Sequence, residues 1–255
     1  LDKSSVSYLP IDEPSINQWL DSLFEQLKET QYTKDLYKVI ADCLDQSKTY
    51  VDFFARVIFQ LYKEEGLVLI DSGHPDVRQL ESNHFVQLIE KQPEISAGVY
   101  NAFLQVKKDE YTISLDVEAR DAHLFYHLNN ERILLIKNEA GDWVGKQNEI
   151  RFTTEELIEV AKYTPELLSN NVVTRPLMQE LLFPTLAFIG GPGEVGYWSV
   201  LKPAFHSLAI NMPPVVPRLS FTYIERHVEK ALNKYNISAE HAINHGIMEL
   251  KEKWL

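Results

Sequence analysis

The stretch Phe188-Ile-Gly-Gly-Pro-Gly-Glu-Val-Gly-Tyr-Trp198 leads from an apolar segment through glycines into a sequence compatible with a helix. Its residues 191–196 satisfy the pattern G-x-G-x-x-G, which occurs in turns that bring backbone amides close to a phosphate. Gly190 and Gly191 also have a purely structural explanation, because glycine permits positive φ angles and close packing. We predict that this strand, turn and helix form part of a small-molecule site.

One interpretation of the turn is a dinucleotide site, and the sequence argues against it. Such sites hold a ribose through an acid about 20 residues beyond the turn. No Asp or Glu occurs between Glu194 and Glu225, and Arg218 could at best bind the 2′-phosphate of NADP. A nucleotide- or NADP-binding Rossmann protein is therefore an alternative and not the preferred interpretation.

A site for a nucleotide or a carboxylate substrate explains more of the surrounding residues. Glu194 can accept hydrogen bonds from a ribose or an ammonium group, and free amides at a helix N-terminus can hold an anion. Between positions 170 and 223 the only acids are Glu180 and Glu194, so this region is neutral to positive. The candidate binding residues are Gly190, Gly191, Gly193, Glu194, Tyr197, Trp198, Lys202, Arg175, Arg218, Ser220 and Asp71.

Several of these candidates have an ordinary structural explanation as well. Lys202 fits an exposed helix lysine, and Asp71 fits the cap of a turn. Trp198 fits a core position, and Arg218 can pair with Glu180 inside the protein. These alternatives stay open at the level of sequence.

Composition excludes several classes of function. The net charge of −12 and the lack of a basic run argue against nucleic acid or an anionic membrane as a partner. No apolar run approaches the length of about 18 residues that a membrane helix needs. The single cysteine, Cys43, lies in a helical stretch and is expected to be a buried structural thiol in a cytoplasmic protein. His123 and His127 would lie about 13 Å apart along a strand, so no metal site is predicted.

The spacing of apolar residues predicts an α/β fold with a Rossmann-like parallel sheet as its core. Gly66-Leu-Val-Leu-Ile-Asp-Ser-Gly73 and residues 184–191 are short apolar runs, as in strands buried on both faces of a parallel sheet. Residues 195–208 predict one helix, and 213–223 predict a third strand or an extended segment. Residues 123–137 predict an antiparallel hairpin, which we interpret as an insertion.

Helical spacing predicts most of the remaining chain. Ser15 is expected to cap the first helix, and Thr153 is expected to begin another capped helix. We divide the chain into a helical connecting segment at 1–65, the first part of the Rossmann-like core at 66–110, a small β-rich insertion at 111–152, the core with its glycine turn at 153–223, and the start of a C-terminal helical coiled coil at 224–255.

Four stretches resemble the bacillithiol biosynthesis cysteine-adding enzymes. They are Asn171-Val-Val-Thr-Arg-Pro-Leu-Met178, Phe183-Pro-Thr-Leu-Ala-Phe-Ile-Gly-Gly-Pro-Gly-Glu-Val-Gly-Tyr-Trp198, Leu201-Lys-Pro203 and Met212-Pro-Pro-Val-Val-Pro-Arg-Leu-Ser220. Gly66-Leu-Val-Leu-Ile-Asp71 fits the same family. The resemblance covers the whole chain and is most specific from position 171 to position 220.

The resemblance implies a ligase that adds the carboxyl group of L-cysteine to the amine of glucosaminyl-malate, which completes a bacterial thiol. It implies a fold similar to class I nucleotidyltransferases, and a homodimer formed through the C-terminal coiled coil. ATP or a related nucleotide is the expected cosubstrate. The family's glycine-rich N-terminal segment, with its His-containing motif, and most of the coiled coil are not recognised in this sequence. We therefore expect an internal fragment.

The same resemblance suggests binding roles and assigns no catalytic residue. Glu194 would bind the ribose or the amine, and Gly191 and Gly193 would let the backbone approach a ligand closely. The three candidate cations would neutralise phosphate or malate carboxylates, and the two aromatic candidates would wall the pocket. A non-catalytic helical assembly module built on residues 1–65 and 224–255 is the competing class of function.

Overall fold

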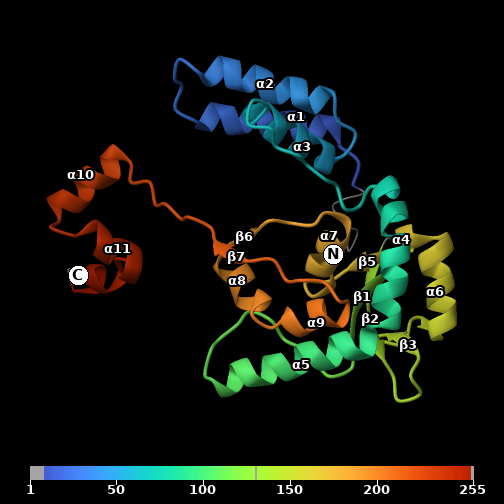
Figure 1. Ribbon diagram of the computed structural model, residues 1–255. Coiled ribbons are helices and arrows are strands. Elements are labelled where there is room, and N and C mark those ends of the chain that lie inside the picture. The colour runs from blue at the N-terminus through green and yellow to red at the C-terminus, as the bar shows by residue number, and fades with distance from the viewer. Residues whose placement is uncertain (1–8, 130, 254–255) are drawn as a thin grey trace. The chain divides into compact units, whose positions relative to one another are not determined.

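The structure is a computed structural model that describes residues 9–129 and 131–253 (Figure 1). It divides into two compact units, one ending at Val216 and one beginning at Pro217, and each unit is described by itself. Residues 1–8 of the predicted helical segment and residues 254–255 of the predicted coiled-coil start lie outside the described residues.

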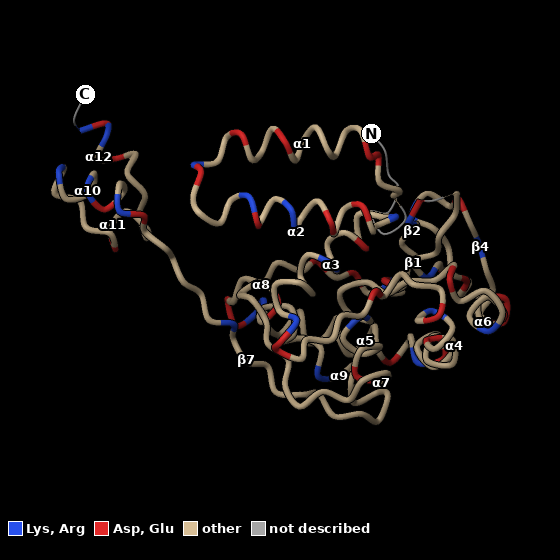
Figure 2. Tube along the Cα trace, turned by 90° about the horizontal axis from the view of Figure 1, so that it is seen from above, with Lys and Arg blue, Asp and Glu red and all other residues tan. Residues whose placement is uncertain are grey.

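The first unit contains helices in two groups along the chain. The helices are α1 Glu13–Gln26, α2 Thr33–Asp45, α3 Tyr50–Leu61, α4 Pro75–Glu90, α5 Gln92–Lys108, α6 Thr154–Tyr163, η2 Pro165–Leu167, α7 Thr174–Leu182, α8 Pro192–Trp198 and α9 Lys202–Ser207. None of the helices in the described ranges is both long enough and apolar enough to cross a membrane. Acidic and basic residues are interspersed along α2 and α4 (Figure 2).

Local capping explains where several helices begin. The Thr153 side chain accepts a hydrogen bond from the backbone of Glu156, whose carboxylate bonds back to the N–H of Thr153. This capping box confirms the predicted start of α6. The prediction for the first helix was wrong in position, because Asp12 is its N-cap and Ser15 lies inside α1. Pro14 fits the first turn, which needs no N–H donor at that position.

Cys43 is buried near the end of α2, as the sequence predicts for a structural thiol. Burial raises the pKa of this thiol, so the protonated form is favoured. A protonated thiol is a weak nucleophile, and the position therefore offers no sign of cysteine chemistry.

The main sheet of the described residues is antiparallel and has the order β4-β3-β2-β1-β5. Its strands are β1 Asp121–Leu128, β2 Glu131–Lys137, β3 Trp143–Gly145, β4 Arg151–Phe152 and β5 Leu168–Asn170. In β1 and β2, Phe125 lies opposite Leu134 and Tyr126 lies opposite Ile133. The expected parallel arrangement is not seen in this sheet. Strands β1 to β4 follow one another through short connections, and parallel pairing needs a crossover of about a dozen residues or more; β5, which follows α6, also pairs antiparallel.

The predicted hairpin at 123–137 is confirmed, but the sheet that it begins is not a peripheral insertion. Its strand β1 also pairs with β5, which follows α6 in the chain, at Leu124–Asn170 and Tyr126–Leu168. Buried side chains of β1 and β2, including Leu124 and Leu135, belong to the same core as those of α4 and α5. The β-rich stretch is therefore central to the first unit.

The apolar run at 66–73 does not form the buried strand that we predicted. Residues 67–71 form no regular element, and the side chains of Leu67, Val68, Leu69 and Ile70 are exposed. A strand buried on both faces needs neighbouring strands for its backbone groups, and the described residues provide none for this run. Apolar composition alone could not indicate whether those neighbours are present.

The segments around the glycine turn are also less regular than predicted. Residues 184–191 form only the short strand β6 Phe188–Gly190, and Leu186 is 95% exposed. Residues 213–223 form only the short strand β7 Val215–Pro217, which pairs with β6. The single helix predicted for 195–208 is instead two helices, α8 and α9, because Pro203 has no N–H and sits in the first turn of α9.

Helices α5, α6 and α7 contact strands of the main sheet. Helix α4 contacts α6 and α7, while α5 contacts α9 and β1. A Cβ atom at Gly98 in α5 would come within 2.7 Å of the Cβ atom of Pro203 in α9, so glycine permits this close approach. Helix α7 packs beside α4, and residues of both helices line a cavity.

The second unit contains the helices α10 Arg226–Lys234, α11 Ala239–His245 and α12 Met248–Glu252. Asn236 and Gly246 have positive φ angles of 56° and 71° and interrupt the helical path. The described residues of the segment predicted to begin a coiled coil form short helices and no long one. A residue with a positive φ angle ends a helix, so the helices of this unit stay short.

Candidate functional site

The glycine turn joins β6 to α8, and its geometry rests on close packing. Positive φ angles occur at glycines 66, 141 and 246 among the described glycines, so Gly190, Gly191 and Gly193 do not require them. A Cβ atom at Gly190 would lie 3.0 Å from Phe188 and 3.2 Å from the Cβ atom of Glu194. The predicted close packing is therefore present at Gly190, and the suggested need for positive φ was wrong.

Glu194 stabilises the turn by capping the helix that follows it. Its Oε2 atom accepts a hydrogen bond from the N–H of Gly191 at 2.9 Å, which makes Glu194 the cap of its own helix. The carboxylate charge therefore already lies at the N-terminus of α8, where it would repel a phosphate. The turn as it stands does not fit a nucleotide phosphate on its backbone amides.

Arg175 connects the glycine turn to α7. Its Nη2 atom donates to the Tyr197 hydroxyl at 2.6 Å and lies 3.9 Å from the Oε1 atom of Glu194. The structure thus brings together three of the predicted site residues, from two helices that the sequence separates by about 20 positions. The Arg175 side chain remains 43% exposed, so a ligand can reach it.

Trp198 is a core residue and does not wall a pocket. Its side chain is 1% exposed and stacks on Phe188, with the ring centroids 4.2 Å apart and an interplanar angle of 17°. Phe205 of α9 packs against it at 5.7 Å. The side chain faces inward because α8 turns its last residue toward the core, and the sequence could not give that orientation.

The remaining predicted residues are exposed, and the described part of the chain shows no contact of theirs with this cluster. Lys202 is exposed at the start of α9, and Asp71 is exposed in a turn where it accepts a hydrogen bond from the N–H of Gly73. Arg218 and Ser220 are exposed residues of the second unit. Glu180, the suggested partner of Arg218, accepts hydrogen bonds from the backbone and hydroxyl of Thr185. Lys202 and Asp71 therefore match their structural explanations.

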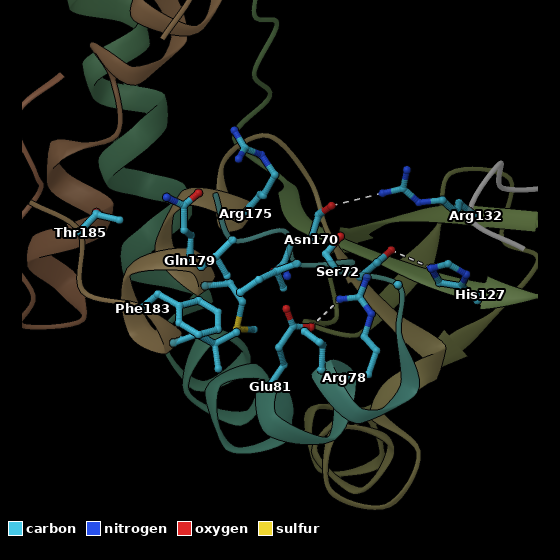
Figure 3. A pocket seen from close by; sticks show the side chains of 17 residues that line it. Ser72, Arg78, Glu81, His127, Arg132, Asn170, Arg175, Gln179, Phe183 and Thr185 are labelled. Carbon is cyan, nitrogen blue, oxygen red and sulfur yellow. Dashed lines mark hydrogen bonds and ion pairs between the residues drawn. The ribbon is translucent and has the colours of Figure 1, made fainter. Parts of the chain in front are cut away.

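A cavity of about 750 Å³ opens beside Arg175, and we call it the Arg78 cavity (Figure 3). Its size falls within the range of about 300–1,000 Å³ that is usual for ligand pockets. The polar and charged side chains that line it are Ser72, Arg78, Glu81, His127, Arg132, Ser169, Asn170, Arg175, Gln179 and Thr185. They come from α4, β1, β2, β5, α7 and the segments next to them.

A buried ion pair forms one wall of the Arg78 cavity. Arg78 and Glu81 of α4 point toward one another in Figure 3, with Nη1 and Oε2 2.5 Å apart and side chains that are only 7% and 4% exposed. Burial raises the pKa of Glu81, against the opposing effect of Arg78. The Nε atom of Arg78 is buried without a hydrogen-bond partner. A ligand acceptor in the cavity could satisfy that donor.

A neutral histidine forms another part of the wall. The Nε2 atom of His127 lies 2.7 Å from the hydroxyl oxygen of Ser169. Burial, together with the nearby charges of Arg132 and Arg78, lowers the pKa of His127 to about 4. The imidazole is therefore uncharged near neutral pH, while Arg132 donates to the backbone oxygen of Asn170 at 3.2 Å.

Taken together, these groups suit a ligand with a negatively charged end. The cavity combines guanidinium groups with neutral hydrogen-bonding side chains, and the one acid among its described lining residues, Glu81, is already paired with Arg78. Arg175 belongs both to this wall and to the glycine turn. Within the described part of the chain, no group of three or more His, Cys, Asp or Glu side chains is arranged to hold a metal ion.

Comparison with known proteins decides the family. Residues 1–219 match the family described as bacillithiol biosynthesis BshC, N-terminal Rossmann-like domain. The chain belongs to this BshC family. The family description confirms a Rossmann-like assignment for the chain, and the structure confirms a mixed α/β fold.

Two BshC relatives match almost the entire chain. One, from Oceanobacillus iheyensis, is 46% identical over 254 residues, which cover 99% of this chain and 47% of the relative. Another, from Bacillus cereus strain ATCC 10987, is 42% identical over 253 residues, with the same coverage of 99% and 47%. Both carry the name "Putative cysteine ligase BshC". The chain spans about half the length of the curated BshC relatives it matches.

Sequence reasoning on this BshC chain found Arg175 but missed the buried polar groups. Arg78, Glu81, His127 and Ser169 lie in stretches that read as ordinary helix and strand. One signal was available: Arg78 and Glu81 are three positions apart on a helix whose other inward residues are apolar. That spacing alone could not show that both side chains are buried.

Proposed function

We propose that this chain is part of a cysteine ligase that joins the carboxyl group of L-cysteine to the amine of glucosaminyl-malate in bacillithiol biosynthesis. The observation that carries the proposal is the similarity of 42–46% identity over 99% of the chain to proteins named as cysteine ligases. The Arg78 cavity supports it, because both reactants bear carboxylates and the cavity presents guanidinium groups.

Amide formation from a free carboxylate needs activation, because a carboxylate oxygen is a poor leaving group. We propose that ATP or a related nucleotide supplies that activation by placing a good leaving group on the cysteine carboxyl. The chain's own contribution is positioning and charge stabilisation of the reacting oxygens. The backbone of the glycine turn does not favour a phosphate, because Glu194 already occupies it, so we assign anion binding to Arg175 and the adjacent cavity.

Arg175 is the central residue of this proposal. Its guanidinium group would bind an oxyanion of a reactant, and Tyr197 would hold it in position through the hydrogen bond of 2.6 Å. Glu194 would limit the rotation of Arg175 while it caps α8. In the full-length protein we further propose a homodimer that includes the C-terminal helices, which sedimentation at several protein concentrations can test.

The test is an assay of the full-length protein for ATP-dependent condensation of cysteine with glucosaminyl-malate. Arg175→Ala is expected to lower kcat/KM by about 10- to 100-fold, because one charged contact to an oxyanion is lost. Lys162→Ala is the control, since Lys162 forms only an exposed pair with Glu159 at 3.4 Å, and its activity should stay within about twofold.

Two outcomes would contradict the proposal in different ways. If the wild-type protein forms no amide product, the ligase assignment is wrong. If product forms and Arg175→Ala is as active as Lys162→Ala, the ligase assignment stands and the placement of the site is wrong. Quenching of tryptophan fluorescence by NADPH but not by ATP would favour the NADP-binding alternative instead.

A further inference from the structure

A second cavity lies on the other side of Arg175, and a buried histidine lines it. This cavity has a volume of about 520 Å³, and we call it the His123 cavity. Arg132, Asn170 and Arg175 line both this cavity and the Arg78 cavity. The His123 side chain is 1% exposed. The two cavities therefore adjoin through shared side chains, while His123 belongs to the second one alone.

The backbone of His123 is held in an uncommon conformation. Its φ angle is 62°, at the point where the register of β1 against β2 shifts. The carbonyl oxygen of His123 accepts a hydrogen bond from the Thr174 hydroxyl at 2.7 Å. Non-glycine residues with positive φ are uncommon and persist where the surrounding structure enforces them. The residues at the start of α7 thus fix where the imidazole ring lies.

Hydrogen bonds to Asn171 determine which nitrogen of His123 carries the proton. The Oδ1 atom of Asn171 accepts from the backbone N–H groups of Val173 at 2.8 Å and Thr174 at 3.2 Å. The Nδ2 atom of Asn171, which can only donate, therefore faces the Nδ1 atom of His123 at 3.3 Å. Nδ1 must accept, so the neutral ring carries its hydrogen on Nε2.

The resulting Nε2–H group is a buried donor without a partner. The Nε2 atom of His123 has no hydrogen-bond partner among the described residues. Burial lowers the pKa of His123 to about 4, so the ring is neutral near pH 7 and stays in this tautomer. Buried donors are satisfied in most proteins, and an unsatisfied one in a cavity wall marks a position for an acceptor. The missing partner is therefore an oxygen with free lone pairs.

Charged groups of both signs line the His123 cavity, and the cations among them can pair with a negatively charged acceptor. The cations Arg132, Lys146 and Arg175 line it. Asp116, Glu118 and Asp121 line it too, but the Asp121 carboxylate accepts from the N–H of Glu118 at 2.8 Å, and the Glu118 carboxylate pairs with Arg120 at 2.9 Å. Two of the three acids thus have a partner within the protein, and the cavity presents guanidinium and ammonium groups as well as the His123 donor to an anion.

We propose that the His123 cavity binds a small molecule through a carboxylate group, which accepts a hydrogen bond from the Nε2–H of His123 and faces the cations of the cavity. The volume accommodates a molecule the size of a small dicarboxylate or an amino acid. The inference does not depend on the ligase proposal, because it concerns binding and not turnover. It gives the Asn171–Thr174 segment the role of a positioning element for His123.

The test is nitrogen-15 NMR of the full chain labelled in its histidine rings, with L-malate and inorganic phosphate as separate probes. The His123 ring is expected to show a protonated Nε2 and an unprotonated Nδ1 at pH 7. L-malate should shift the Nε2 resonance in a saturable way, and phosphate at equal ionic strength should not. The ring spectrum of the wild type tests the proposal even without a variant.

Two variants separate the cavities. His123→Asn can keep a positive φ angle but lacks the ring donor, and it should weaken L-malate binding by about 10-fold or more. His127→Asn changes only the Arg78 cavity and should bind L-malate within about twofold of the wild type. Calorimetry gives the affinities, and a thermal melt shows that each variant is folded.

Several results would overturn the proposal. One is a His123 ring protonated on Nδ1 at pH 7, and another is the lack of any saturable shift with L-malate. Equal shifts with phosphate would overturn the assignment to a carboxylate. A folded His123→Asn variant that binds L-malate as tightly as the wild type would show that the ligand lies elsewhere. Loss of binding in His127→Asn alone would place it in the Arg78 cavity.

Discussion

The glycine turn and the cavity walls beside α7 use their polar groups in different ways. In the turn, the Glu194 carboxylate accepts a hydrogen bond from the N–H of Gly191, and Trp198 packs in the core, where its buried Nε1 atom has no hydrogen-bond partner among the described residues and lines neither cavity. In the cavity walls, Arg78 and His123 keep buried donors that no described residue satisfies. The glycine motif therefore identifies a well-packed turn. The buried donors that line cavities, those of Arg78 and His123, lie in segments without a recognisable motif.

The difference between the turn and the cavity walls indicates which groups can bind a ligand. In a tight turn, the hydrogen-bonding groups hold the turn's own geometry, so few of them can bind a ligand. A buried polar group without a partner costs free energy of about 1–3 kcal/mol, and a protein retains such a group where a ligand or water can satisfy it. Arg175 links the two regions, because it touches Tyr197 of the turn and lines both cavities.

The largest expected effect concerns the buried ion pair of the Arg78 cavity. Arg78→Ala should lower the free energy of unfolding by about 3–5 kcal/mol, because it leaves the buried Glu81 carboxylate without its partner. Urea unfolding measures the change. The control Lys91→Ala breaks an exposed pair with Glu94 at 3.1 Å and should cost under about 1 kcal/mol. Equal losses in both variants would show that the Arg78 pair is not buried.

A smaller effect concerns the pH dependence that His123 adds. The pKa of the folded ring is about 4 against an ordinary value of 6.5, so the unfolded chain takes up a proton that the folded chain does not. Stability should therefore fall as the pH drops through this range, by about 2 kcal/mol between about pH 7.5 and about pH 5. His123→Asn should lack that portion of the slope. An unchanged slope in this variant would mean that the ring is not buried.

The smallest effect is expected in the glycine turn itself. A Cβ atom at Gly193 would meet only the hydroxyl oxygen of Ser114, at 3.6 Å, so Gly193→Ala should change the free energy of unfolding by under about 0.5 kcal/mol. Gly98→Ala is the contrast, because its Cβ atom would clash with Pro203 and should cost about 1–3 kcal/mol. Differential scanning calorimetry distinguishes the two.

The Gly193→Ala variant also tests whether the glycine turn, rather than the cavities, binds the ligand. If the turn brings its backbone against a ligand, the variant should lose ligase activity in the full-length protein while its stability stays the same. We expect activity within about threefold of the wild type, because the anion contacts belong to Arg175 and the cavities. A large loss of activity at unchanged stability would return the binding role to the turn.

Local patterns predicted a good part of the fold. The capping box at Thr153, the hairpin at 123–137 and the helix that carries Arg175 were predicted correctly, because capping and strand turns depend on residues a few positions apart. The apolar run at 66–73 was not, because whether such a run forms a strand depends on partners far away in the chain. The split between α8 and α9 was missed although Pro203 signalled it.

The sequence by itself determined the family, the helical and strand-forming segments, and the acidic character of the chain, since these depend on residue identity and short-range spacing. Only the tertiary structure decided that Trp198 is core and that His123 carries its proton on Nε2. It alone brought Arg78, Asn170 and Arg175 around neighbouring cavities. The burial of a side chain and its hydrogen-bond partners depend on segments that are distant in the sequence. They decide the protonation state of each side chain and which donors have no partner.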